Sequence, residues 1–469
     1  MNDWHRLGSV TICLVAGSLL NACATATVRP VVDVRPISIT DVATSVSDAF
    51  LIGGGGVDWA RTVLCPTDNW CALFGFGNKS FTESTDFFVV VEGHANAPSW
   101  AQTYGGTHRD TLRTAALASG GGYLLVGTSQ SLFFTALKVI SPSRPPRPFV
   151  VNIDAAGAPR WALTFDSLVG EFFGAALTSD GGHVLVGHNP LAGSGRKSAL
   201  AALKLSAGGQ VLWARAYDFG ANAVGMAAVP TADGGIAIAG FTAADDGRFL
   251  KTVLMKVDGQ GVPLWARLYA TEGRNGAYSL TEMADSSLVA AGSADAANGD
   301  RGVFVLKVSS AGTSVWAFSF EGLRNGQAMH VIPGHGSDIL VAGRMADGPH
   351  GGYDGLALLL DTDGAPKASL VLGGPKDDEI MAAARWNAGR YRLVGSTENF
   401  GAAFVDVLSV VWSPRVVAAE VLSNLDPKGL TIEETAAPEI ARVDLRPTAV
   451  QLPLSSIEST KLAVPATNR

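Results

Sequence analysis

Charged side chains recur at one place in this sequence, a few residues after each of several tryptophan-containing segments. They are Asp166, Asp218, Glu272, Arg274, Glu321 and Arg324. Carboxylates grouped with arginines could bind a cation or the hydroxyl groups of a glycan. Because both signs are present, we favour solvated loops with local salt bridges, and a ligand site built from these residues is the alternative.

The other residue types that carry chemistry form no known constellation. The histidines show neither a His-x-x-x-His pair nor a shared place in the sequence, which argues against a metal site. Gly-x-Ser-x-Gly, a phosphate-binding loop and Cys-x-x-Cys are all missing from the sequence. The motifs that would indicate a hydrolase, a nucleotide-binding protein or a redox protein are therefore absent. We therefore predict no catalytic residue, no metal and no cofactor.

The first 22 residues have the features of an export signal. Arg6 precedes an apolar run from Leu7 to Leu20, which is too short to span a bilayer. The run leads into Leu20-Asn-Ala-Cys23, which resembles the lipobox of bacterial lipoproteins. This resemblance implies removal of residues 1–22, lipidation of Cys23 and, because Ala24 follows, export to the outer membrane. An ordinary secretory signal cut near Ala24 is the alternative.

Two cysteines remain in the mature chain once Cys13 is removed and Cys23 is lipidated. They are Cys65 and Cys71. Disulfides persist in the exported compartment, and the spacing fits two strands that leave one turn. We predict a disulfide between Cys65 and Cys71, with two free thiols as the alternative.

A repeated unit of 51 or 52 residues organises the chain. Four copies of a turn followed by a strand contain Trp161, Trp213, Trp265 and Trp316, whose spacings are 52, 52 and 51 residues. The next copy has alanine, Ala368, in the place of the tryptophan. A fixed period of this length indicates a repeat architecture.

A second marker, an apolar strand that ends in glycine, gives the number of copies. It occurs at Gly75, Gly127, Gly187, Gly240, Gly292, Gly343 and Gly395. Each of the seven copies holds four strand-like stretches, which is the size of one propeller blade. We predict an all-β fold, a seven-bladed β-propeller of four-stranded antiparallel blades over residues 47–412. A lipid tether and linker (23–46) precede it, and a C-terminal extension (413–469) follows.

We expect the ring to be closed by the N-terminal strand. Residues 49–52 would complete a blade whose other strands lie at the far end of the chain, by pairing with residues 403–411. A competing closure uses Trp412 and residues 416–417. In the favoured closure, the loops that follow the tryptophan strands and the glycine-ended strands share a first face. The tether then enters from the opposite, second face.

Two further segments stand outside the regular repeat. One unit is longer by about nine residues and contains a proline-rich loop, which predicts a polyproline-like projection. Its candidate partner-binding residues are Ser143, Arg144, Pro145, Pro146 and Arg147. A tolerated surface insertion is the alternative. In the C-terminal extension, Asp444-Leu-Arg-Pro447 echoes Asp33-Val-Arg-Pro36, and we expect these two segments to lie together beneath the ring.

The repeated unit resembles the tryptophan-docking repeat of quinoprotein-type propellers. The resemblance rests on the tryptophan, the turn glycine before it and the strand before that turn. The unit is also similar to that of a large group of exported bacterial propeller proteins, most of which have no assigned activity. It implies that each tryptophan packs between neighbouring sheets and does not contact a ligand.

Composition excludes one class of partner. The net charge is −7 and no cluster of Lys and Arg is longer than a pair, so we expect no nucleic acid. We predict a binding or scaffolding module for a protein or a glycan, attached to the membrane through its lipid. The alternatives are a propeller enzyme, quinoprotein-like or carbohydrate-active, and an accessory lipoprotein of an envelope assembly complex.

Overall fold

The computed structural model describes residues 46–414 and six short segments outside this range. Within 46–414 the residues left undescribed are 54–55, 79–84, 94–99, 107, 131–145, 166–169, 191–197, 245–248, 296–298, 322, 324, 347–348, 388 and 403. The six outer segments are 33–36, 426–429, 433–436, 441–444, 449–451 and 458–462. None of these described residues belongs to a helix long and apolar enough to cross a membrane.

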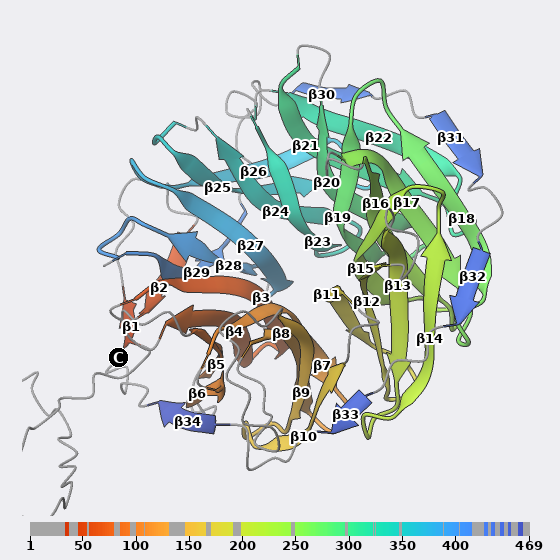
Figure 1. The fold of residues 1–469 in the computed structure, drawn as a ribbon. Helices are drawn as coiled ribbons and strands as arrows, with labels where there is room; N and C mark the ends of the chain where they lie inside the picture. Colours follow the sequence, from red (N-terminus) through yellow and green to blue (C-terminus); the bar gives the residue numbers. More distant parts are fainter. Residues whose placement is uncertain are drawn as a thin grey trace, which may run out of the picture.

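Seven antiparallel sheets stand around a central axis, which confirms the predicted propeller (Figure 1). We number the blades 1 to 7 from β3, and the strands of each blade outward from the axis. The innermost strands are β3 (Asp58–Thr67), β7 (Asp110–Ala118), β11 (Glu171–Leu177), β15 (Asn222–Pro230), β19 (Asn275–Glu282), β23 (Gln327–Pro333) and β27 (Asp378–Arg385). The second strands are β4 (Trp70–Asn78), β8 (Gly122–Ser129), β12 (His183–Pro190), β16 (Ile236–Ala243), β20 (Leu288–Asp295), β24 (Ile339–Ala346) and β28 (Tyr391–Thr397).

The two outer positions of each blade complete the ring. The third strands are β5 (Thr85–Gly93), β9 (Arg147–Ile153), β13 (Ser198–Leu205), β17 (Phe249–Val257), β21 (Arg301–Val308), β25 (Tyr353–Leu360) and β29 (Asp406–Trp412). The fourth strands are β6 (Trp100–Gly105), β10 (Pro159–Phe165), β14 (Val211–Asp218), β18 (Pro263–Ala270), β22 (Ser314–Glu321), β26 (Pro366–Leu372) and, for blade 7, β2 (Val46–Gly53).

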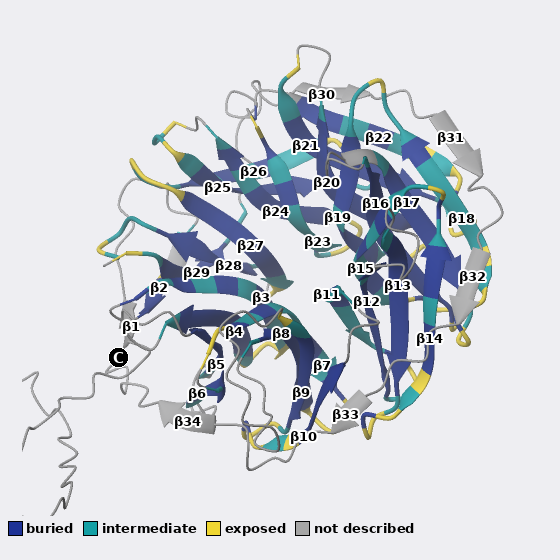
Figure 2. Cartoon of the chain, viewed as in Figure 1, coloured by how far each residue is buried: buried dark blue, intermediate teal, exposed yellow. Residues whose placement is uncertain are grey.

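The middle strands are apolar almost throughout because both faces of each blade are covered by a neighbour. All eight residues of β8 are buried, and Figure 2 shows the same burial around the ring. Side chains of adjacent blades meet in these interfaces. The rings of Phe74 in blade 1 and Tyr123 in blade 2, for example, lie 5.0 Å apart edge to face. Strands buried on two faces lose the polar alternation of a half-exposed strand.

The repeated glycines of the second strands are required by a bulge in each innermost strand. In every blade the pairing between these two strands shifts by one residue at the same place. A Cβ built on Gly187 would overlap the carbonyl oxygen of Glu171, and one built on Gly240 would overlap that of Val224. Only glycine therefore fits opposite the bulge.

The ring is closed by β2, as predicted. Leu51 pairs with Leu408 and Ile52 with Val407, so that β2 is the fourth strand of blade 7. The competing closure through Trp412 is wrong, because Trp412 is the last residue of β29 and pairs with Val46. A sheet completed from both ends of the chain leaves no open edge at the junction.

The C-terminal extension forms a belt around the outside of the ring. Its five short strands are β30 (Asp426–Gly429), β31 (Glu433–Ala436), β32 (Ala441–Asp444), β33 (Ala449–Gln451) and β34 (Glu458–Leu462). They add a fifth strand to blades 5, 4, 3, 2 and 1 in turn (Figure 1). The belt runs opposite to the order of the blades and pairs with the C-terminal residues of the fourth strands of blades 1 to 5.

The two similar segments, residues 33–36 and 444–447, were expected to lie together, but Asp33 and Asp444 lie on different blades. Strand β1 (Asp33–Pro36) is the fifth strand of blade 7, whereas Asp444 ends β32 on blade 3, so the two do not lie together. The chain enters β2 from the second face, as expected. However, β1 runs antiparallel to β2 and pairs Asp33 with Gly53, so Asp33 lies at the first-face end of the blade. Cys23 lies outside the described residues.

Candidate functional site

The predicted charged site falls on the first face, in the loops that join one blade to the next. Asp218 ends β14 and accepts the N–H of Gly220 at 2.8 Å, while Arg274 binds Asp295 of its own blade at 2.5 Å. Glu272 is exposed. Asp166, Arg324 and the side chain of Glu321 lie outside the described residues. Asp218 and Arg274 thus make local contacts, and a shared ligand site on the predicted residues stays a prediction.

The proline-rich loop joins the second and third strands of blade 2 on the same face. Ser143, Arg144 and Pro145 lie outside the described residues; Pro146 is exposed and Arg147 begins β9. The partner-binding role of this loop stays a prediction. The disulfide between Cys65 and Cys71 is present in the turn between β3 and β4, on the second face.

Two arginines, one in an innermost strand and one in a second strand, form ion pairs across neighbouring blades. Arg113 stands at the bulge of β7, binds Glu171 of blade 3 at 2.9 Å and lies over the ring of Phe173. Arg344 of blade 6 binds Glu379 of blade 7 at 3.0 Å. Burial raises the pKa of Glu379, and the charge of Arg344 opposes that rise. Each of these carboxylates is neutralised by an arginine.

Buried aspartates face glycines at the first-face ends of blades 1, 6 and 7. A Cβ on Gly53, Gly105 or Gly373 would overlap a carboxylate oxygen of Asp406, Asp86 or Asp354, respectively. A second aspartate reaches the same glycine from the next blade at two of these places: Asp110 at Gly105, and Asp378 at Gly373.

These carboxylates also accept backbone N–H groups, and their burial changes their acidity. Asp110 accepts the N–H of Gly106 at 2.9 Å, and Asp378 that of Gly374 at 2.8 Å. Burial raises the pKa of Asp354 and of Asp378. Among the described residues no group of three or more His, Cys, Asp or Glu is placed to hold a metal ion.

The tryptophans of blades 1 to 5 each dock on the following blade. The indole Nε1 donates to a backbone carbonyl in the turn between the third and fourth strands of that blade. The pairs are Trp100 to Ala155 (3.1 Å), Trp161 to Ala207 (2.9 Å), Trp213 to Gly259 (2.9 Å), Trp265 to Ser310 (3.1 Å) and Trp316 to Thr362 (3.2 Å). Each ring also covers the glycine of that turn, so the tryptophan is a wedge between blades.

Beside three of these tryptophans an aliphatic side chain points to solvent. Leu212, Leu264 and Val315 precede the tryptophans of blades 3, 4 and 5 and are 54%, 57% and 58% exposed. Val262, which follows the turn glycine covered by Trp213, is 39% exposed. These four residues lie in or just before the fourth strands of blades 3 to 5, and we call them the apolar band. At the same place blades 2 and 6 carry Arg160 and Lys367.

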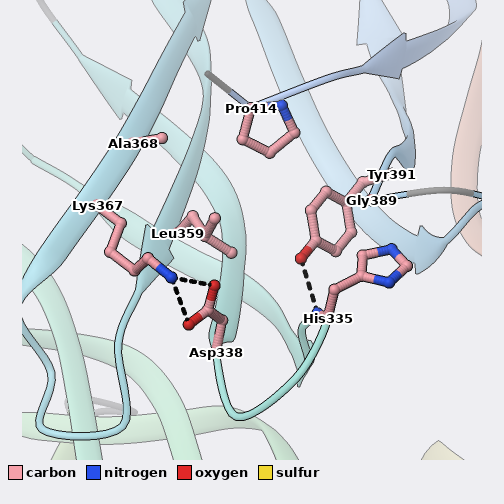
Figure 3. A pocket seen from close by; sticks show the side chains of 8 residues that line it. All are labelled: His335, Asp338, Leu359, Lys367, Ala368, Gly389, Tyr391 and Pro414. Carbon is pink, nitrogen blue, oxygen red and sulfur yellow. Dashed lines mark hydrogen bonds and ion pairs between the residues drawn. The ribbon is translucent and has the colours of Figure 1, made fainter. Parts of the chain in front are cut away.

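A cavity of about 200 Å³ lies beyond the apolar band, between blades 6 and 7 (Figure 3). It is lined by His335, Asp338, Leu359, Lys367, Ala368, Gly389, Tyr391 and Pro414. Lys367 binds both oxygens of Asp338, at 2.8 and 2.6 Å, and the Tyr391 hydroxyl accepts the N–H of His335 at 3.0 Å. The cavity, the apolar band and the paired aspartates were not predicted from the sequence.

Comparison with known proteins finds similar solved structures at low sequence identity. No protein-family model and no curated protein matches the chain. Among solved structures, it is similar to the WD40 domain of Pan2 from Neurospora crassa, at 13% identity over 76% of this chain and 90% of that one, with a TM-score of 0.44. Sqt1 from Chaetomium thermophilum is 11% identical over 76% of this chain and 96% of that one, with a TM-score of 0.39. A glucose dehydrogenase is 10% identical over 64% of this chain and 98% of that one, with a TM-score of 0.34. The seven sheets themselves define the propeller.

Proposed function

We propose that this protein is a binding module of the bacterial cell envelope, anchored at the outer membrane by lipid on Cys23, that recognises a protein partner through the apolar band. The observation that supports this most directly is the exposure of Leu212, Leu264 and Val315 at equivalent positions of three consecutive blades. Aliphatic side chains that are more than half exposed at the same place in consecutive blades suit an interaction surface.

The chemistry of the apolar band favours a protein over a glycan. Its exposed side chains are aliphatic, and they adjoin indole rings whose N–H groups are already used within the ring of blades. Apolar contact of this type forms the centre of protein interfaces. Charged residues, Arg160 and Lys367, stand at the same place in the two flanking blades and would form a polar rim.

The test is site-specific photo-crosslinking in intact envelopes, with the photoreactive residue placed at Leu264. We expect a discrete protein adduct that is lost when Leu212→Ser and Val315→Ser are added. Glu272, exposed on the first face, is the matched control site and should give no such adduct. An adduct to lipid alone, or the same adduct from both sites, would refute the proposal.

Anchoring is tested separately. Cys23→Ser should release the protein from the outer-membrane fraction, because a lipid anchor depends on acylation of that cysteine. The released chain should remain folded, since Cys23 lies before the strands of the ring. Retention of the variant in the membrane fraction would count against the lipid anchor and leave the crosslinking result unaffected.

A further inference from the structure

Ala368 occupies the place that a tryptophan fills in blades 1 to 5. At this register a lysine pairs with the tryptophan in blades 3 to 5 (Lys204, Lys256 and Lys307), Asn152 does so in blade 2 and Val91 in blade 1, whereas blade 6 pairs Leu359 with Ala368. Compared with blades 3 to 5, both members of the pair are changed in blade 6. The indole is missing, and an aliphatic residue replaces the lysine.

The two replacements create the cavity and keep the charge balance around it. In blades 3 to 5 the third-strand lysine binds an aspartate of the nearby turn, as Lys256 binds Asp233 at 2.6 Å. In blade 6 Gly336 stands at the place of that aspartate, and Asp338, two residues later in the same turn, is bound by Lys367 from the fourth strand. Leu359 and Ala368 are thereby left as apolar walls, with the ion pair beside them (Figure 3).

The position of the hydrogen-bond acceptor is retained. In blades 4 and 6 the carbonyl that receives an indole N–H stands two residues beyond the end of the third strand, at Gly259 after Val257 and Thr362 after Leu360. In blade 7 that position is Pro414, which follows Trp412 by two residues and lines the cavity.

The segments that flank the ring, residues 24–47 and 413–469, contain no Phe, Tyr or Trp. Tyr391, which lines the cavity, is buried in blade 7 and packs on Trp412 with ring centres 6.1 Å apart. Neither of these two rings takes the place of the missing indole.

We propose that the cavity between blades 6 and 7 binds the indole ring of a tryptophan presented by a partner protein. Trp100, Trp161, Trp213, Trp265 and Trp316 show within the same chain how such a site holds an indole. Trp316, in the last blade of the apolar band, docks on Thr362 in the turn that precedes Lys367 and Ala368 of blade 6. The inference rests on the proposed function and specifies the chemistry of the partner.

The test uses isothermal titration of the full mature protein with N-acetyl-L-tryptophanamide, with N-acetyl-L-leucinamide as the control ligand. We expect saturable binding of the tryptophan ligand to the wild type and affinity at least about tenfold weaker for the leucine ligand. Ala368→Trp is the decisive variant, because it supplies the ring from the chain itself. It should fold and lose the binding by at least about tenfold. Ala368→Leu, which fills part of the space, should weaken binding by a smaller factor.

The outcomes separate this inference from the proposed function. If the wild type does not bind the tryptophan ligand, or if Ala368→Trp binds it unchanged, the cavity is not an indole site, whatever the crosslinking at Leu264 shows. If the ligand binds and Ala368→Trp abolishes it, the site is supported even where the apolar band proves to have no partner. Loss of the crosslinked partner in Ala368→Trp would show that the indole site and the apolar band bind the same partner.

Discussion

Asp354 of blade 6 and Asp378 of blade 7 meet at one glycine. A Cβ on Gly373 would overlap Oδ1 of Asp354 and lie 3.1 Å from Oδ2 of Asp378. Burial raises the pKa of both carboxyls, and the charge of Asp354 further raises that of Asp378. When both carboxyls are ionised, two negative charges therefore lie close together at the junction of blades 6 and 7.

The junction should therefore be less stable at neutral pH than at acid pH. A carboxyl with a raised folded pKa weakens the fold progressively as the pH rises from its unfolded to its folded pKa, and the whole loss is present above the folded value. We expect Asp354→Asn to raise the free energy of unfolding at pH 7 by about 1 kcal/mol, and to have little effect below the ordinary pKa of aspartate. Urea titrations at both pH values measure this, with Asp363→Asn in an exposed turn as the control. A gain of equal size at both pH values would contradict the charge explanation.

The docking of Trp213 should contribute strongly to stability. Trp213→Ala removes a ring that is 94% buried, as its exposed fraction is 6%, together with the bond to Gly259, and should cost about 3 kcal/mol. Trp213→Phe keeps most of the contact and loses the donor, for a cost of about 1 kcal/mol. Leu212→Ala, next in sequence and exposed, should change the free energy of unfolding by less than about 0.5 kcal/mol. Equal effects of the Ala and Phe variants would show that the ring contact contributes little.

The glycine opposite the bulge should not tolerate a side chain. Gly240→Ala would place its Cβ on the carbonyl oxygen of Val224, and relief requires movement of the innermost strand. We expect a loss of about 3 kcal/mol in denaturant unfolding. Gly259→Ala is the matched control, because no atom lies within 4 Å of its Cβ position, and it should be neutral. Similar losses for the two variants would mean that glycine flexibility, and not space, is what matters.

The disulfide closes a short turn between two strands that are already paired. Cys65 and Cys71 are six residues apart in sequence, and loss of such a link should cost about 2 kcal/mol. The double variant Cys65→Ala with Cys71→Ala should unfold at lower denaturant concentration than the oxidised wild type. Reduction of the wild type should bring it to the midpoint of the variant. No response of the wild type to a reductant would argue that the link contributes nothing to stability.

The ring could be predicted from the sequence because the repeated units can be aligned with one another. The tryptophan spacing and the glycine-ended strands count the blades, and residues 49–52 are left over as the strand that closes the ring. The belt could not be predicted in the same way. A strand such as β32, with four residues, is too short to show any alternation of polar and apolar side chains, and its place depends on the outer edge of β14.

The sequence contains signs of the candidate site, but they can be interpreted only once the strand pairing is known. Ala368 in the place of a tryptophan is visible in the sequence, but the coupled change at Leu359 is visible only once the strand register is known. Likewise Asp354 and Asp378 come together only because the chain passes from blade 6 to blade 7 at Gly373. Ion pairs near the axis, such as Arg113 with Glu171, join residues from separate repeats and carry no periodic signature.

The pairing of β2 with β29 sets the order in which the molecule can mature. The strand that closes the ring is made before all seven innermost strands, and its partner is the last strand of the ring to be synthesised. During synthesis β2 therefore stays without its partner until β29 has been made, and the pairing of the two strands is a late contact of very long range. Folds that depend on such distant contacts assemble slowly and expose unpaired edges meanwhile. The belt strands, made later still, can dock only on blades that have already formed.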